Sequence, residues 1–192
     1  MLDSASYNIA RKQTNIATYE IGSVFISNEE KVTKQPKENL RLSGVLTGEW
    51  VTHPWQQEKK KVDFFVMKGI LDELFERLNV NVTYTATKIE NMHPGRTAEL
   101  SIDNRVIGFA GQLHPLLEKE YDLNETYVFD IDYDYLVNIH ENEPSFSDIP
   151  RYPGITRDIA LVVEHTIQSG DIQRVIHNAG GDILQSIRVF DV

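Results

Sequence analysis

The side chains best suited to metal or acid–base chemistry in this chain are its histidines, which are scattered along the sequence. They are His53, His93, His114, His140, His165 and His177. No two of them combine an i, i+4 spacing with a third ligand, which is the pattern of a zinc site. The chain has no cysteine, so thiolate chemistry and disulfides are excluded. We therefore predict surface or hydrogen-bonding histidines, no metal site, and no nucleophile–base pair for a hydrolase.

Two short motifs superficially resemble ligand-binding loops. The sequence contains no GxxxxGK[ST], GxSxG or GxGxxG motif. Residues 108–111 (Gly-Phe-Ala-Gly) lie inside an expected strand, where close backbone packing or a bulge explains the glycines better. Asp130, Asp132 and Asp134 alternate like metal ligands, but they lack the glycine and the closing glutamate of an EF-hand. We predict a solvated strand edge for these carboxylates.

Aromatic and basic side chains gather between residues 50 and 61. Trp50, His53 and Trp55 flank a proline in an expected loop, and three consecutive lysines follow at 59–61. Aromatic rings interleaved with cations can stack on nucleotides or on a protein partner. Two tryptophans in one loop are more typical of a local cluster or a protein interface, and we favour the interface.

Residues 93–96 (His-Pro-Gly-Arg) fit a type II turn, in which the glycine supplies the positive φ. Such a turn would place His93 beside Arg96. One interpretation is a contact with an anion or a partner. The other, which we favour, is a turn that lets residues 97–102 enter the sheet.

The composition limits what the whole chain can bind. Its 192 residues carry a formal net charge of −10, which argues against autonomous nucleic-acid binding because phosphates require a positive face. No run of apolar residues is long enough for a transmembrane helix, and the N-terminus lacks the apolar core of a signal peptide. With no cysteine, these features fit a cytoplasmic protein that makes no membrane contact.

The elements that must position these residues form an α+β domain. We predict an antiparallel sheet of about six strands with helices on one side. The strongest helix spans 62–78, where apolar residues recur at i, i+3, i+4 and i+7 and Asp63 can cap the start. The other expected helices are 2–13, 114–121 and 133–139, and the expected strands are 17–26, 39–47, 80–87, 97–102, 105–112 and 127–132. Asp103 and Asn104 form a tight hairpin turn.

A second folding unit is expected to begin near residue 148. A polar connector at 141–148 precedes two prolines, and the apolar run 159–163 then has the composition of a buried strand. The pattern predicts a strand at 155–164, a helix at 169–179 and a strand at 183–191. About 45 residues are too few for a typical independent domain.

Five motifs in this order resemble the β-subunit family of bacterial phenylalanyl-tRNA synthetases. They are ATYEIGSVF, VDFFVMKGILDEL, HPGRTAEL, IGFAGQLHP and RYPGITRDIALVV. The resemblance implies that residues 1–144 form a class II synthetase-like, non-catalytic core. It also implies that residues 148–192 form the first half of a ferredoxin-like anticodon-binding domain.

The resemblance carries expectations about function. The intact phenylalanine–tRNA ligase attaches phenylalanine to its tRNA with ATP and magnesium, as a cytoplasmic heterotetramer of two α and two β subunits. The α subunit holds the active site, and the editing domain of the β subunit lies upstream of this chain. Active class II enzymes have an ATP-binding arginine in a Phe-Arg-x-Glu pattern. Thr18 occupies that place in residues 17–20, so we expect this piece to serve subunit assembly and tRNA positioning, without a cofactor.

Two sets of residues are candidates for these contacts. The candidates for the subunit interface are Trp50, His53, Trp55, His93 and Arg96. The candidates for tRNA contact are Arg151, Arg157, Arg174 and Arg188, although residues 145–192 carry more acidic than basic side chains. Arg157 is equally suited to a structural pair with Asp158.

The second unit departs from the family pattern because a ferredoxin-like domain is βαββαβ and only βαβ is present. Its first two strands would flank an empty slot. We therefore predict that they are poorly paired, rearranged, or completed by another molecule. The alternative hypothesis is a regulatory module of the amino-acid-binding type, with a small ligand near Gly180 and Gly181.

Overall fold

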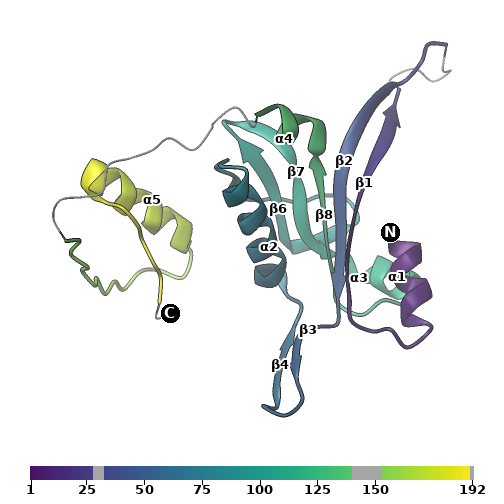
Figure 1. Cartoon of the computed structure of the whole chain (residues 1–192), viewed down its shortest axis with the longest axis horizontal. Coiled ribbons are helices and arrows are strands. Elements are labelled where there is room, and N and C mark those ends of the chain that lie inside the picture. Colours follow the sequence, from purple (N-terminus) through teal and green to yellow (C-terminus); the bar gives the residue numbers. More distant parts are fainter. Residues whose placement is uncertain (28–32, 140–152, 191–192) are drawn as a thin grey trace. The chain divides into compact units, whose positions relative to one another are not determined.

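The computed structural model describes residues 1–27, 33–139 and 153–190. The chain divides into two compact units, residues 1–146 and 147–192, and each is described by itself (Figure 1). The expected connector at 141–148 lies outside the described residues. No helix in the described part is long and apolar enough to cross a membrane.

The first unit is built on a six-stranded antiparallel sheet, as predicted. The strands are β1 (Ile16–Ile26), β2 (Lys37–Thr47), β5 (Thr83–Ala86), β6 (Met92–Ile102), β7 (Arg105–Leu113) and β8 (Thr126–Asp132). Their spatial order is β1-β2-β8-β7-β6-β5, so β8 inserts between β2 and β7 (Figure 1). The turn between β6 and β7 is confirmed, because Asp103 and Asn104 both adopt positive φ, as a tight hairpin turn requires.

Residues expected to form a loop after β2 form a second, two-stranded sheet. It pairs β3 (Glu49–His53) with β4 (Glu58–Lys61). Figure 1 shows this hairpin projecting from the six-stranded sheet. The loop prediction was wrong because the segment has few apolar residues and lacks the apolar alternation that indicates a strand.

Helix α2 (Phe64–Arg77) confirms the strongest helix prediction. The carboxylate of Asp63 caps it by accepting a hydrogen bond from the Val66 amide at 2.7 Å. Its buried face consists of Val66, Met67, Leu71 and Phe75. Met67, Leu71 and Phe75 of this face pack in the main core together with Leu136 of α4 (Tyr133–Ile139) and inward-facing residues of the sheet.

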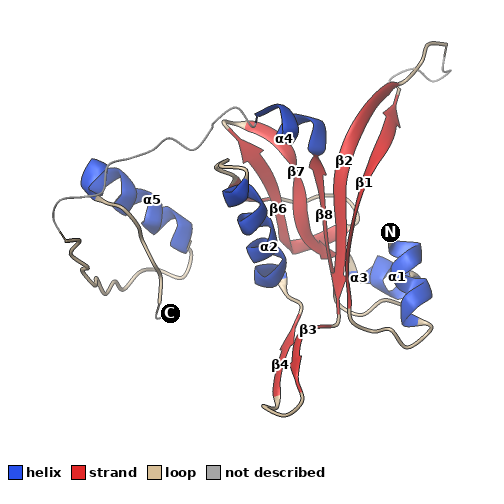
Figure 2. Ribbon diagram, viewed as in Figure 1, coloured by secondary structure: helices blue, strands red, loops and turns tan. Residues whose placement is uncertain are grey.

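Helices cover both faces of the sheet, so the prediction of helices on one side was wrong (Figure 2). Leu42 and Leu46 of β2 belong to the main core under α2 and α4. Val45 points the opposite way, because successive strand residues alternate between faces. It joins a second cluster with Ala5 of α1 (Leu2–Ile9) and with residues beside α3 (Pro115–Glu120). α1 and α3 are short and bury little, so their sequences did not reveal which face they cover.

The type II turn expected at residues 93–96 does not form. These residues lie inside β6, and Gly95 is not among the described glycines with positive φ. Met92 lies opposite Leu113, and the next paired residue, Thr97, lies opposite Gly111. The four residues 93–96 of β6 therefore face a single residue of β7, and β6 bulges there. The Thr97 hydroxyl donates to the His93 carbonyl at 2.7 Å and closes the bulge.

In the second unit, helix α5 (Ser169–Gly180) confirms the predicted helix, and a 3₁₀ turn, η1 (Gly181–Ile183), follows it. The strands expected at 155–164 and 183–191 are not formed within the described residues 153–190. No sheet closes over this part of the chain, which agrees with the expectation that a half-module leaves these segments without strand partners. Their apolar side chains, among them Ile159 and Leu161, are exposed.

Candidate functional site

The sheet face opposite α2 and α4 carries a polar network that the sequence did not indicate. Nε of Arg41 on β2 donates to Oδ1 of Asp130 on β8 at 2.7 Å. The Ser43 hydroxyl donates to the other oxygen of Asp130 at 2.5 Å. Both members of the ion pair are about three-quarters buried, with 24% and 30% of their side chains exposed. Strand pairing produces the network, because Ser43 lies directly opposite Asp130.

The acidic series at 130–134 does not form the solvated edge that we predicted. β8 is an interior strand, and each carboxylate has a protein partner. Asp132 accepts the Tyr135 amide at 3.0 Å and pairs with Arg105 at 3.6 Å. Asp134 accepts the Leu40 amide at 2.8 Å. The carboxylates therefore fix strand β2 and helix α4 against β8, and their alternation is structural.

Thr18 lies on this polar face, because it pairs with Val45, which points away from the main core. Glu20, two residues further along β1, is on the same side. Arg41 also faces this side, but its guanidinium is already neutralised by Asp130. The phosphates of a nucleoside triphosphate bound here would lie near carboxylates and near an arginine that is already paired. The described part of the face therefore offers little to stabilise phosphate charge.

Arg96 belongs to a second network, which holds the bulge of β6. Its Nη1 donates to Gln112 at 2.9 Å and to Glu125 at 2.6 Å. The Tyr127 hydroxyl donates to the same Glu125 oxygen at 2.8 Å. The imidazole of His93 accepts the Gly95 amide at 3.1 Å. Both interface candidates in the bulge thus have contacts within the chain, and the Arg96 side chain remains about half exposed.

Burial, together with the hydrogen bond to Glu125, raises the pKa of Tyr127 to about 12. The phenol of an unfolded chain ionises near pH 10. The protonated Tyr127 phenol therefore contributes its full stabilisation of the folded state below about pH 10. This contribution is lost as the pH rises to about 12. We expect Tyr127→Phe to make the free energy of unfolding fall less steeply with pH in this window, measured by urea denaturation. Tyr19→Phe, at an exposed position, is the matched control, and an unchanged slope in Tyr127→Phe would contradict the prediction.

Three of the five interface candidates lie together on the β3–β4 hairpin. Trp55 is in its turn and is 89% exposed, while Trp50 occupies a bulge in β3 and is about half exposed. His53 lies opposite Glu58. Lys59 forms a loose ion pair with Glu49, at 3.6 Å. This contact leaves the lysine side chains of the hairpin exposed to solvent. The hairpin presents a large aromatic surface beside cations at the end of a projecting ribbon.

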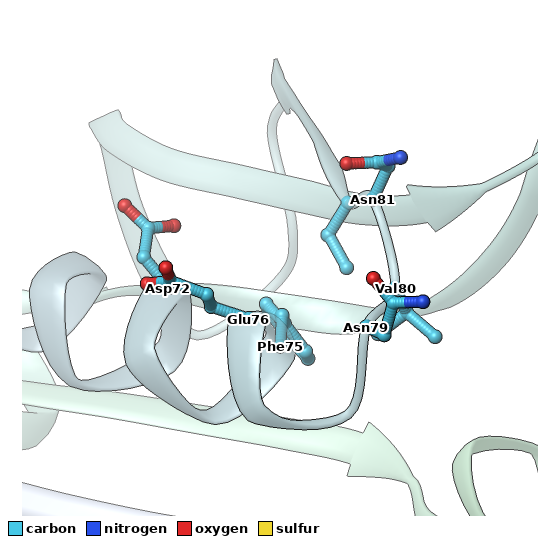
Figure 3. Close-up of a pocket in the computed structure, with 7 residues that line it drawn as sticks. Asp72, Phe75, Glu76, Asn79, Val80 and Asn81 are labelled. Atoms are coloured by element: carbon cyan, nitrogen blue, oxygen red, sulfur yellow. The ribbon is translucent and has the colours of Figure 1, made fainter. Parts of the chain in front are cut away.

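A pocket of about 360 Å³ lies at the C-terminal end of α2 (Figure 3). Its lining residues are Asp72, Phe75, Glu76, Asn79, Val80, Asn81 and Val82. Asp72 is already engaged, because it accepts the Tyr84 hydroxyl at 2.9 Å and binds Lys68 at 2.5 Å. The lining contains no cation and no nucleophile–base pair, so we assign the pocket no chemistry.

The arginines of the second unit that we predicted to contact tRNA differ in their ion pairing. Arg174 pairs with Asp171 on α5 at 3.0 Å. Arg157 and Arg188 make no ion pair with a described residue, so the possible pair of Arg157 with Asp158 is not formed. Arg151 lies outside the described residues. The structure thus leaves two exposed arginines available for an anion.

The fold of the first unit is that of a class II aminoacyl-tRNA synthetase. The chain is similar to the crystal structure of pyrrolysyl-tRNA synthetase from Desulfitobacterium hafniense, with a TM-score of 0.50. The match covers 73% of this chain and 49% of that chain, at 12% sequence identity, and therefore concerns the fold alone. The mainly antiparallel sheet with its helices confirms the predicted fold class.

The chain belongs to the phenylalanyl-tRNA synthetase β-chain family. Residues 1–133 match the family model described as "Phenylalanyl tRNA synthetase beta chain CLM domain". Residues 150–192 match the "Ferredoxin-fold anticodon binding domain". The second match supports the anticodon-binding interpretation over the amino-acid-binding alternative.

Curated relatives named phenylalanine–tRNA ligase β subunit match along the entire chain. Those from Oceanobacillus iheyensis and Bacillus subtilis are 50% and 46% identical to it, over 100% of this chain and 24% of each relative. The relative from Geobacillus kaustophilus is 49% identical over the same shares. The chain therefore spans about a quarter of the length of these relatives, and the resemblance seen in the sequence motifs is confirmed.

Proposed function

We propose that this chain is a non-catalytic part of a phenylalanine–tRNA ligase, in which it serves subunit assembly and tRNA positioning. Residues 1–144 would be the synthetase-like core and residues 148–192 the first half of the anticodon-binding domain. The observation that carries the proposal is the polar sheet face, where Thr18 stands in the place of the ATP-binding arginine and Arg41 is neutralised by Asp130. A class II core with this face would lack, at this position, the arginine that stabilises phosphate charge.

The intact ligase would join phenylalanine to its tRNA with ATP and magnesium in the cytoplasm. Its active site would lie on the α subunit, and two α and two β subunits would assemble. The names of the curated relatives support the β-subunit role. The chain itself would hold neither cofactor.

The β3–β4 hairpin is our proposed contact with the α subunit. Trp55 is almost fully exposed. A tryptophan at the tip of a projecting hairpin is suited to be buried in an interface with another protein. Trp50 and His53 would extend the contact along β3. His93 and Arg96 are weaker members of the interface, because the bulge of β6 already engages them.

Co-expression with a matching α subunit tests this assignment. We expect the two chains to co-purify, and we expect Trp55→Ala to weaken the complex at least tenfold, as an interface anchor does. Both tryptophans of the chain lie in the hairpin, so a change in tryptophan emission on adding a tryptophan-free α subunit would report the contact directly. Phe65→Ala, at an exposed aromatic of α2, is the control. Failure of the α subunit to co-purify with this chain or a full-length β subunit would overturn the assignment.

Arg157 and Arg188 are our leading tRNA contacts, followed by Arg151 and Arg174. They would act in the intact ligase, because the chain is acidic overall. In a full-length β subunit assembled with α, replacing Arg157 and Arg188 by glutamine should weaken tRNA binding and flatten its salt dependence. Replacing Lys88 and Lys119 by glutamine, at exposed positions of the first unit outside the hairpin, is the matched loss of two charges. An unchanged salt slope in the arginine variant would rule these two residues out.

A further inference from the structure

We draw no further inference here: the strongest candidate, the outer edge of strand β1, with which no described strand pairs and along which Tyr19 and Phe25 are exposed, carries none because nothing in the structure shows what covers it.

Discussion

Gly108→Ala is expected to destabilise the first unit by about 3 kcal/mol, as a severe clash between two backbones does. Gly108 lies on β7 opposite Ile131 of β8. A Cβ at this position would stand 2.0 Å from the carbonyl oxygen of Asp130. Because the obstacle is backbone, no side chain can rotate away, and β7 must separate from β8. Urea denaturation followed by far-UV circular dichroism measures the change.

The matched control is the same substitution at Gly69, which lies in the middle of α2. A Cβ there meets nothing within 4 Å, so alanine fits without strain. Because glycine is a poor helix former, Gly69→Ala should stabilise the unit by up to about 1 kcal/mol. The two variants should thus differ in sign. A Gly108→Ala variant as stable as the parent would show that β7 and β8 are not in contact as described.

Leu71→Ala is the second large effect that we expect, a loss of about 3 kcal/mol in the free energy of unfolding. Leu71 is 1% exposed and packs from α2 into the main core. Truncation removes buried methyl groups and leaves a cavity that the rigid sheet below cannot fill. The same urea titration measures the loss.

Leu116→Ala is the control for this change, because Leu116 is an exposed leucine on another helix, α3. We expect it to alter stability by no more than about 0.5 kcal/mol. Similar losses in both variants would mean that α2 does not cover the sheet as described. The pair also tests the helical periodicity by which the sequence predicted the buried side of α2.

The two networks of the first unit engage arginine side chains within the chain itself. In each, an arginine on a strand pairs with a carboxylate that is distant in the sequence, Arg41 with Asp130 and Arg96 with Glu125. Such pairs hold strand register, and they occupy the charges that a phosphate would otherwise require.

Local patterns predicted most of the elements. The helical period of α2, its Asp63 cap and the positive-φ pair Asp103 and Asn104 are all short-range signals, and all three predictions are confirmed. Close backbone packing at residues 108–111 was also predicted, and the position of a Cβ at Gly108 confirms it. The first three depend on neighbours within a few residues, whereas Gly108 meets the backbone of Asp130 and Ile131 on β8.

The wrong predictions concern residues whose role depends on distant partners. A turn at residues 93–96 would have suited Pro94 and Gly95, but pairing of β6 with β7 extends the strand through them. Asp130 and Asp132 looked solvated because the sequence gave no sign that β8 lies between β2 and β7. The network of Arg41 with Asp130 joins residues 89 positions apart, so no local pattern could indicate it.

The sequence by itself determined the family and the α+β class. It could do so because ordered motifs and periodicity are written along the chain. Only the tertiary structure decided that Arg41 is neutralised, that Trp55 stands at the tip of a hairpin, and that β1 has an open edge. Strand order brings distant residues together or leaves them exposed, and this depends on how the whole chain packs.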